Sequence, residues 1–150
     1  MTVFLADSAA TDAFAQQIFY RLPAETGGWV VLLEGELGAG KSTFARALIV
    51  AAGHRGPVPS PTYTLVEPYQ LPSGIVYHVD LYRISSVEEL RFLGWNELDD
   101  GLRLVEWPDR APQLVNSADI RLTLSYDGAG RSVQIDGLSE RGQQLIADIN

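Results

Sequence analysis

The sequence predicts a three-layer α/β domain, in which a mixed parallel and antiparallel sheet lies between helices. A continuous apolar segment, a glycine-rich loop and an amphipathic segment follow one another directly, as in a parallel strand joined to its helix. Two pairs of alternating segments further along are typical of antiparallel hairpins. The chain has 150 residues, 46% of them apolar and 20% charged, so we expect one domain over 1–150 that folds alone.

The first element that we expect is a helix near the N-terminus. Apolar residues recur at helical spacing from Ala10 to Leu22, behind a capping Asp7 or Ser8. Pro23 ends this pattern, because proline cannot continue a helix.

A strand, a loop and a second helix come next. The run "WVVLLE", from Trp29 to Glu34, is apolar throughout, which is typical of a strand covered on both faces. From Ser42 onward apolar residues recur on one helical face, which predicts a helix. Gly53 can adopt the left-handed conformation that ends a helix.

The rest of the chain alternates between hairpins, helices and one buried strand. After a proline-rich loop, we expect a hairpin of strands 63–70 and 75–82 and then a helix with capping-box spacing at Ser85 and Glu88, closed by Gly94. We then expect a buried strand over 102–107 ended by Pro108, a hairpin of strands 120–126 and 131–137, and a final helix over 138–149.

Composition narrows the classes of function. A net charge of −8 argues against a large direct contact with nucleic-acid phosphates, so any RNA would be held by something else. The chain has no cysteine and two histidines, so a metal must use oxygen ligands. The sequence has no basic leader with an apolar core and no long apolar span, so we expect no membrane contact and a cytoplasmic location.

The segment "GELGAGKST" carries the strongest chemical signal. The phosphate-binding pattern GxxxxGK[ST] is met by Gly35, Gly40, Lys41 and Ser42. Its glycines let backbone N–H groups turn toward phosphates, and the following helix directs its positive end at them. The residues that we expect to contact the nucleotide phosphates are Gly38, Ala39, Gly40, Lys41, Ser42 and Thr43.

Lys41 is the only lysine, and arginines make up the rest of the 11 basic residues. A lysine supplies a compact ammonium on a flexible stem, whereas a guanidinium is bulkier and has a fixed fork. One lysine at this position in an arginine-using chain fits a need for that point charge. The adjacent hydroxyl of Ser42 is suited to ligate Mg²⁺.

Two carboxylates and one hydroxyl are candidates to complete the site. Asp80 and Glu106 each close an apolar strand, where open α/β sheets place their ligands, and either could ligate Mg²⁺ directly. A solvated acid at a strand end is the alternative for each. Thr62, in the rigid loop "SPTYT", fits a residue that senses the γ-phosphate, although turn chemistry alone also explains it.

Other polar residues receive plainer interpretations. His78 alternates with apolar neighbours in a strand and is interpreted as a packed histidine. Trp107 either belongs to the core or leans on the nucleotide. We interpret Asp119 and most arginines as solvated surface.

Four segments, "GELGAGKST", "SPTYTLVEPY", "YHVDLYR" and "LVEWP", together resemble the TsaE (YjeE) family of bacterial P-loop ATPases. They run from Gly35 to Pro108 in the family's order. The resemblance implies a P-loop ATPase needed to form the threonylcarbamoyl group on adenosine 37 of tRNAs reading ANN codons. It also implies a TsaB–TsaD complex as partner, in which TsaD carries the transfer chemistry, ATP hydrolysis supports repeated turnover, and tRNA is contacted mainly through the partners.

The resemblance also implies roles for individual residues, with ATP and Mg²⁺ as cofactors. Lys41, Asp80, Glu106 and Thr62 match catalytic positions, and Ser42, Glu106 and Asp80 match metal-binding positions. The matched nucleotide-binding positions are Gly38 to Thr43, Trp107 and, at the base, a segment that would lie near Ser8.

Two alternatives remain open. A small-molecule P-loop kinase shares the strand, loop and helix, but such enzymes usually add an arginine-bearing lid, and no obvious lid is present. A binding module that uses nucleotide as a switch with negligible turnover would share the whole site. A GTPase is disfavoured, because its guanine-reading motif needs a second lysine.

Overall fold

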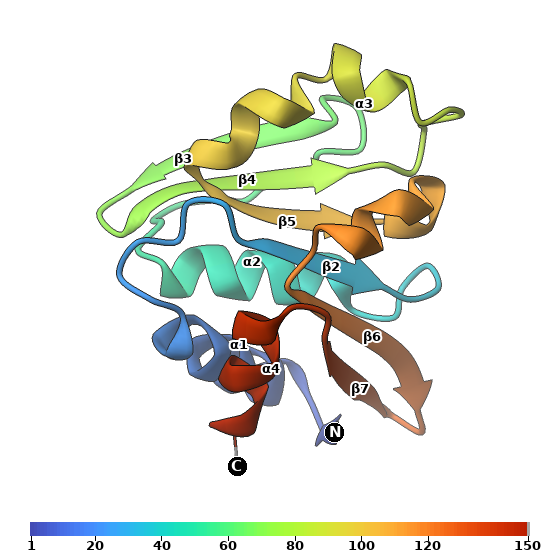
Figure 1. The fold of residues 1–150 in the computed structure, drawn as a ribbon. Helices are drawn as coiled ribbons and strands as arrows, with labels where there is room; N and C mark the ends of the chain where they lie inside the picture. Colours follow the sequence, from blue (N-terminus) through green and yellow to red (C-terminus); the bar gives the residue numbers. More distant parts are fainter. Residues whose placement is uncertain (150) are drawn as a thin grey trace.

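The computed structural model describes residues 1–149, which form one seven-stranded mixed sheet with helices around it (Figure 1). The strands lie in the order β1-β7-β6-β2-β5-β4-β3. Their bounds are β1 (Thr2–Leu5), β2 (Val30–Glu34), β3 (Val66–Leu71), β4 (Gly74–Asp80), β5 (Leu102–Glu106), β6 (Ile120–Asp127) and β7 (Gly130–Gly137).

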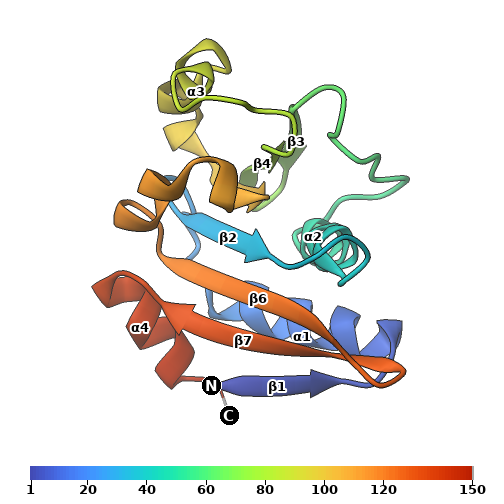
Figure 2. The same ribbon diagram turned by 90° about the vertical axis from the view of Figure 1, so that its right-hand side faces the viewer.

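Helices cover both faces of this sheet (Figure 2). The α-helices are α1 (Ser8–Arg21), α2 (Lys41–Ala51), α3 (Glu89–Phe92) and α4 (Glu140–Ala147). Three 3₁₀ helices are η1 (Trp95–Asp100), η2 (Pro108–Arg110) and η3 (Pro112–Asn116). The predicted three-layer α/β arrangement with a mixed sheet is therefore confirmed.

The centre of the sheet is parallel and its margins are antiparallel. β2 pairs in parallel with β5 on one side and β6 on the other, and β5 pairs in parallel with β4. β3–β4 and β6–β7 are the two predicted hairpins. Parallel strands point the same way, so the last residues of β2, β4 and β5, which are Glu34, Asp80 and Glu106, meet at one edge.

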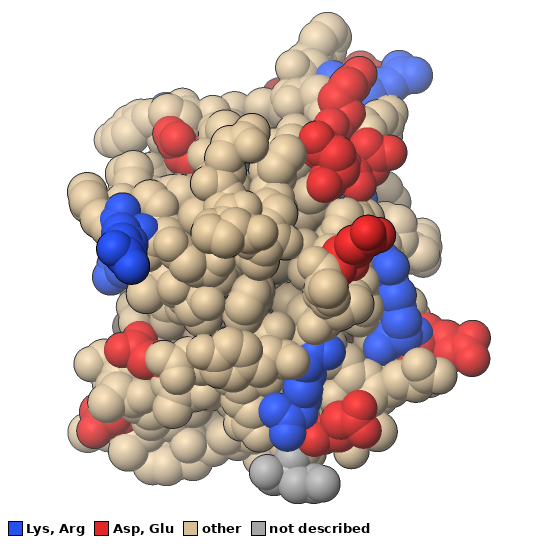
Figure 3. All heavy atoms as spheres, turned by 90° about the vertical axis from the view of Figure 1, so that its left-hand side faces the viewer, with Lys and Arg blue, Asp and Glu red and all other residues tan. Residues whose placement is uncertain are grey.

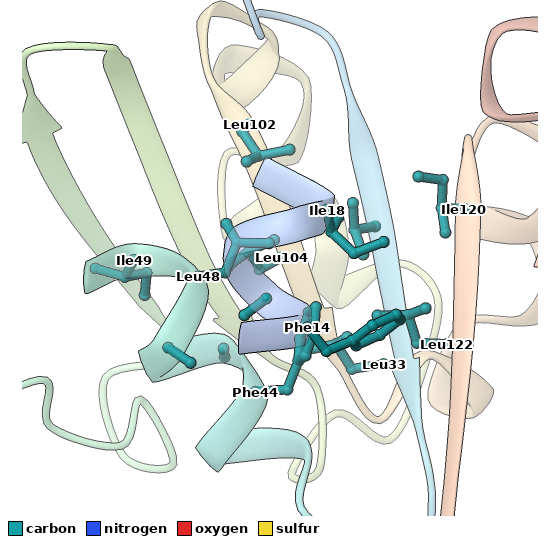
Figure 4. Close-up of a cluster of buried hydrophobic side chains, with 14 of the residues drawn as sticks. Phe14, Ile18, Leu33, Phe44, Leu48, Ile49, Leu102, Leu104, Ile120 and Leu122 are labelled. Atoms are coloured by element: carbon teal, nitrogen blue, oxygen red, sulfur yellow. The ribbon is translucent and has the colours of Figure 1, made fainter. Parts of the chain in front are cut away.

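The larger core lies between the sheet and the helices α1 and α2 (Figure 4). Phe14 and Ile18 from α1 meet Phe44 and Leu48 from α2, and the two phenyl rings have centroids 6.0 Å apart. Leu33 of β2 packs beneath them. Burying side chains of this size stabilises the fold by about 1.5–3 kcal/mol each, so this core anchors α2 on the sheet.

The opposite face has a smaller core. Val30 and Leu32 of β2 point to this face and pack with Val105, Leu90 and Leu114. Residues of the strand β2 thus alternate between two cores, which explains why its sequence is apolar throughout.

β1 is a strand that the sequence patterns do not predict. It has four residues and pairs antiparallel with β7 at the margin of the sheet. A segment this short shows too little alternation to distinguish a strand from a loop.

The helix expected from Ser85 to Gly94 is shorter than predicted. The Ser85 hydroxyl donates to Glu89 Oε1 (2.6 Å), so it does not form the expected capping box with Glu88. Gly94 closes α3 in the left-handed region (φ 75°), as expected, and η1 follows.

Several strand boundaries also differ from the prediction; the strand expected over 75–82, for example, ends at Asp80. The strand expected from Tyr63 begins at Val66, because Leu65 has a positive φ of 68°. The strand expected to reach Trp107 ends at Glu106, because Trp107 has a φ of 58°. None of the helices within residues 1–149 is both long and apolar enough to cross a membrane.

Candidate nucleotide-binding site

The loop between β2 and α2 has the backbone that the glycine pattern predicts. Gly40 caps α2 with a left-handed φ of 113°, and Gly38 has a φ of 83°. A Cβ at Gly38 would overlap the hydroxyl of Tyr126, and a residue with a side chain would be strained at this positive φ. Lys41 is the first residue of α2, and the helix therefore begins at the residue that carries the positive charge.

The ammonium of Lys41 lies inside this loop, and the residue as a whole is 4% exposed. It donates to the carbonyls of Gly35 (2.5 Å) and Glu36 (3.0 Å) and lies 4.1 Å from the centroid of the Trp107 ring. Burial lowers the pKa of Lys41 below its ordinary value of 10.5, and the carboxylate of Glu106 opposes this shift. The side chain is thus a buried cation held at the leading end of a helix.

Ser42, Glu106 and Asp80 come together beside Lys41. The Ser42 hydroxyl donates to Glu106 Oε1 (2.9 Å), and Asp80 is the register partner of Glu106 in the parallel β4–β5 pair. The two carboxylate residues are only 4% and 2% exposed. Burial is the main cause that raises the pKa of Asp80 above 3.8, and the nearby Glu106 adds to it. Two buried carboxylates in register repel each other, so a bound cation would be stabilised between them.

The loop that carries Thr62 reaches the same carboxylates. Thr62 Oγ1 donates to Asp80 Oδ2 (3.3 Å) and lies 2.7 Å from Ser60 Oγ. The carbonyl of Leu65 accepts from the Asp80 amide (2.9 Å). The loop is therefore fastened to the end of β4, and the hydroxyl of Thr62 lines one cleft with Lys41.

Ser8 lies on the other side of the loop over residues 35–40 between β2 and α2, which we call the phosphate loop. It lines a second cleft together with Gly38, Gly40 and Thr43, and Arg131 from the β6–β7 hairpin also lines that cleft. Ser8 is therefore adjacent to the phosphate loop but separate from the carboxylates. The placement is compatible with a nucleotide whose phosphates lie on the loop and whose base lies near the start of α1.

The sequence interpretation missed the position of His78. Its Nε2 lies 2.6 Å from Glu106 Oε2, and the residue is 1% exposed. The sequence did contain an indication that His78 lies near the site. His78 and Asp80 are two residues apart in β4, and residues two apart in a strand share one face of the sheet. His78 is packed, as expected, but it is packed against a site carboxylate.

Trp107 lies at the site and also packs, partly buried, against the smaller core. Its ring contacts the Lys41 ammonium and also lies 4.9 Å from the ring of Tyr82. A non-glycine residue with a φ of 58° stores backbone strain, which concentrates at functional sites.

Asp119 is buried, so its interpretation as solvated surface is wrong. It is 3% exposed and accepts from the Val30 amide (3.0 Å), the Ser139 hydroxyl (2.7 Å) and Arg141 Nε (2.8 Å). These partners come from β2 and the start of α4, so the sequence around Asp119 does not reveal them. Arg103, at 8% exposed, is likewise not a surface residue.

The oxygen atoms at this edge fit Mg²⁺ better than they fit a metal that needs a full protein cage. No group of three histidine, aspartate or glutamate side chains suited to hold a metal occurs within residues 1–149. The candidate set is one hydroxyl, of Ser42, and two carboxylates, of Asp80 and Glu106. Mg²⁺ is usually bound by one or two carboxylates and keeps several waters, so this small set suffices.

A glycine loop between a parallel strand and a helix, with carboxylates at the ends of two neighbouring strands, gives the chain an α/β fold of the P-loop NTPase-like kind. A family model described as "Threonylcarbamoyl adenosine biosynthesis protein TsaE" matches residues 5–133. The chain belongs to the TsaE family, and the resemblance found in the sequence is confirmed.

Individual relatives agree with this assignment. Proteins named tRNA threonylcarbamoyladenosine biosynthesis protein TsaE are similar to it in three bacteria. That of Haemophilus influenzae is 38% identical, covering 79% of this chain and 76% of its own length. Those of Synechocystis and Borreliella burgdorferi are 38% and 35% identical, covering 76% and 83% of this chain and 74% and 90% of their own lengths.

A solved structure supports the fold independently. The crystal structure of Bacillus subtilis YdiB superposes with a TM-score of 0.79 at 23% identity and covers 99% of this chain and 92% of that one. At this identity the likeness shows a shared fold and says nothing of the function of the site residues.

Proposed function

We propose that this chain is a Mg²⁺-dependent ATPase, a single P-loop ATPase domain over 1–150. It supports formation of the threonylcarbamoyl group on adenosine 37 of tRNAs that read ANN codons. It acts with a TsaB–TsaD complex in the cytoplasm, and its hydrolysis is weak alone and rises with these partners. Membership of the TsaE family supports the pathway, and the geometry of the site supports the chemistry.

One observation carries the proposed chemistry, namely that Lys41, Ser42, Asp80 and Glu106 converge from three elements. α2 contributes the first two residues, and β4 and β5 contribute one carboxylate each. The Ser42–Glu106 hydrogen bond of 2.9 Å joins the phosphate loop to the carboxylate pair. A cation and an oxygen cluster side by side are what a metal–triphosphate complex requires.

The chain's own groups supply binding and orientation. Lys41 gives its charge to the β- and γ-phosphates, and the loop amides from Gly38 to Thr43 donate to their oxygens. Ser42, Asp80 and Glu106 would hold Mg²⁺, which neutralises charge on the phosphates when bound. The carboxylates also orient the attacking water, because they are fixed by hydrogen bonds of their own.

Three further residues contact other parts of the nucleotide in this proposal. Thr62 contacts the γ-phosphate, since its hydroxyl already lies at the carboxylate cleft. Trp107 packs against the nucleotide beside Lys41. Ser8 lies near the base, in the cleft beyond the phosphate loop.

The charge of the protein supports indirect contact with tRNA. The net charge of −8 repels a polyanion. On the face shown in Figure 3, acidic and basic side chains of the described residues are interspersed and form no continuous basic surface. We therefore assign most of the tRNA contact to the partners.

Phosphate release from ATP tests the proposal, measured with and without TsaB and TsaD. We expect weak Mg²⁺-dependent release by the chain alone, stimulation by the partners, and loss of both in Lys41→Ala. The matched control is Arg91→Ala, which removes a positive charge from α3, away from the site. No stimulation by the partners, together with unchanged threonylcarbamoyladenosine in cells depleted of the protein, would contradict the proposal.

The same preparations separate the two alternatives. ADP formation that depends on an added metabolite would indicate a small-molecule kinase. If Glu106→Gln abolishes hydrolysis while partner binding and tRNA modification survive, the nucleotide acts as a binding switch with negligible turnover.

A further inference from the structure

His78 is a buried polar residue to which the proposed function assigns no task. It lies in β4, two residues before Asp80, and its register partner in β5 is Leu104. The side chain reaches diagonally across the strand pair to the carboxylate of Glu106, where Nε2 and Oε2 are 2.6 Å apart. At 1% exposure, the imidazole has no competing contact with bulk water.

The hydrogen-bond partners fix which nitrogen carries the proton in this contact. Glu106 Oε2 accepts, so Nε2 of His78 is the donor. Nδ1 is buried and has no hydrogen-bond partner in the part of the chain that the structure describes. A proton on Nδ1 would therefore be a buried, unpaired N–H, which is unfavourable. The ring is thus suited to a single task, donation from Nε2.

The two oxygens of Glu106 have different partners. Oε1 accepts from the Ser42 hydroxyl (2.9 Å), and Oε2 accepts from His78. The last torsion of a glutamate side chain has a broad, two-fold profile, so one hydrogen bond leaves the carboxylate free to turn. Donors on both oxygens hold its plane, with Oε1 directed at the phosphate loop.

We propose that His78 is a positioning residue that keeps Glu106 Oε1 directed at Ser42 and at the magnesium site, by donating from Nε2 to Oε2. The inference rests on the proposed function, because the geometry of Glu106 matters for Mg²⁺ and water only if the site holds them. Asp80 has an equivalent support in the amide of Tyr82, which donates to its Oδ1 (2.9 Å). Each carboxylate of the pair is thus oriented by a donor outside the phosphate loop.

The first test compares His78→Leu, which removes the donor, with His78→Gln, which retains an amide donor on a side chain of similar reach. Loss of a residue that orients a metal ligand lowers metal affinity or activity by about 10- to 100-fold. We expect His78→Leu to show such a loss in kcat and in the apparent affinity for Mg²⁺, while the KM for ATP stays close to that of the wild type. His78→Gln should restore most of both quantities.

The matched control is His54→Leu, since His54 is the other histidine of the chain and its Nε2 faces the Pro57 carbonyl, away from the carboxylates. We expect it to leave kcat and the Mg²⁺ dependence unchanged. Equal losses in His78→Leu and His78→Gln, or wild-type kinetics in His78→Leu, would overturn the proposal while leaving the ATPase assignment intact.

Two further readouts are independent of ATP hydrolysis, and the first of them needs no variant at position 78. Nitrogen-15 NMR of a His54→Gln protein leaves His78 as the one imidazole. We expect a proton on Nε2, a bare Nδ1, and a change in the Nε2–H signal in Glu106→Gln. Calorimetric titration of Mg²⁺ into the ADP-saturated protein should show tighter binding for the wild type than for His78→Leu.

These measurements distinguish a failure of the positioning role of His78 from a failure of the ATPase assignment. If the wild type binds Mg²⁺ and ADP but hydrolyses no ATP, the ATPase assignment fails and the calorimetric comparison still decides the role of His78. A proton found on Nδ1, or equal Mg²⁺ affinity with and without the imidazole, refutes the positioning role.

Discussion

The surroundings of Lys41 explain why a lysine, and not an arginine, occupies this position. Its ammonium is buried against two carbonyls and the ring of Trp107, beside two carboxylates. These neighbours fit a compact charge at the end of a flexible stem. A guanidinium at this position would bring a larger planar group into a space already bounded by the loop backbone.

We therefore expect both Lys41→Ala and Lys41→Arg to weaken nucleotide binding. A charge-assisted hydrogen bond contributes about 1.5–3 kcal/mol, so each substitution should raise the Kd for Mg·ADP by about 10- to 150-fold. Isothermal titration calorimetry measures this directly. Wild-type affinity in Lys41→Arg would mean that the site needs only a positive charge and not the shape of lysine.

Asp119 gives a residue-scale prediction about stability and pH. Burial raises the pKa of its carboxyl, but hydrogen bonds from Arg141, Ser139 and the Val30 amide outweigh it, so the pKa lies below 3.8. A carboxyl whose pKa is lower in the folded state than in the unfolded state stabilises the folded protein at pH values above the unfolded-state pKa. That contribution is lost as the pH falls through the folded value.

Asp119→Asn should therefore lower the free energy of unfolding at neutral pH by about 1–3 kcal/mol, and the difference from the wild type should shrink below about pH 4. Urea denaturation between about pH 3 and 7 measures both quantities. A difference that stays constant over this range would show that the carboxylate charge is not what stabilises the contact.

The sequence indicated the loop residues and the two strand-end carboxylates as candidates, but it did not predict the side-chain contacts that depend on strand pairing. Gly40, Lys41 and Ser42 are adjacent in the chain, so their spacing alone indicates the loop. His78 and Glu106 belong to different strands, and their contact depends on the β4–β5 register, which no local pattern contains. Asp119 was misinterpreted for the same reason, because its partners lie on β2 and α4.

At the scale of elements, the β6–β7 hairpin supports the phosphate loop from outside the nucleotide motif. The Tyr126 hydroxyl donates to the Leu37 carbonyl (3.1 Å), and Arg131 Nη2 donates to the Gly38 carbonyl (3.3 Å). The guanidinium of Arg131 lies 4.3 Å from the centroid of the Tyr126 ring. The hairpin and the loop thus form one unit, although they are far apart in the sequence.

Tyr126→Phe should weaken ADP binding without unfolding the protein. A neutral hydrogen bond contributes about 0.5–1.5 kcal/mol, so the Kd should rise by about 2- to 12-fold. Tyr126 is 49% exposed, and the phenyl ring is retained, so the melting temperature should change little. Tyr20→Phe, on an exposed tyrosine of α1, is the matched control, and equal Kd values in the two variants would exclude a role for the hairpin contact.

The elements themselves were predictable where they are long and periodic. β2, α2 and both hairpins follow from apolar runs and alternation, and they agree with the structure to within a few residues. β1 is too short to show a period, and α3 begins only at Glu89, where the Ser85 hydroxyl donates to the Glu89 side chain and no side chain among the described residues caps the helix. The 3₁₀ helices that cover the second core depend on packing with β2 and β5 and have no local signature.

At the scale of the molecule, strand order brings the site together. β2 lies between β5 and β6, so after β2 and α2 the chain forms β3, β4 and β5 on one side of β2 and then β6 on the other. Open α/β sheets bind ligands outside the carboxyl ends of strands where the order reverses. The phosphate loop follows β2 at this point, and the carboxylates of Asp80 and Glu106 arrive from the neighbouring strands. A local motif is thereby completed by distant residues.

The charge of the whole molecule yields the last prediction, which concerns tRNA. Association with nucleic acid is driven by release of counterions when lysine and arginine neutralise phosphates. A protein with a net charge of −8, in which 19 acidic residues outnumber 11 basic ones, has little of this driving force. We expect the isolated protein to show no saturable tRNA binding at about 150 mM salt and little salt dependence at lower concentrations.

Fluorescence anisotropy of labelled tRNA measures this with the protein alone, with TsaB and TsaD alone, and with all three. We expect tRNA binding only in the samples that contain TsaB and TsaD. Adding this chain with Mg·ATP should change the affinity of the assembly for tRNA only when Lys41 is intact. Tight binding by the isolated chain that falls steeply with salt would mean that its arginines form a direct phosphate-binding surface. The tRNA would then be held by this protein itself, and the proposal that the partners make most of the tRNA contact would be wrong.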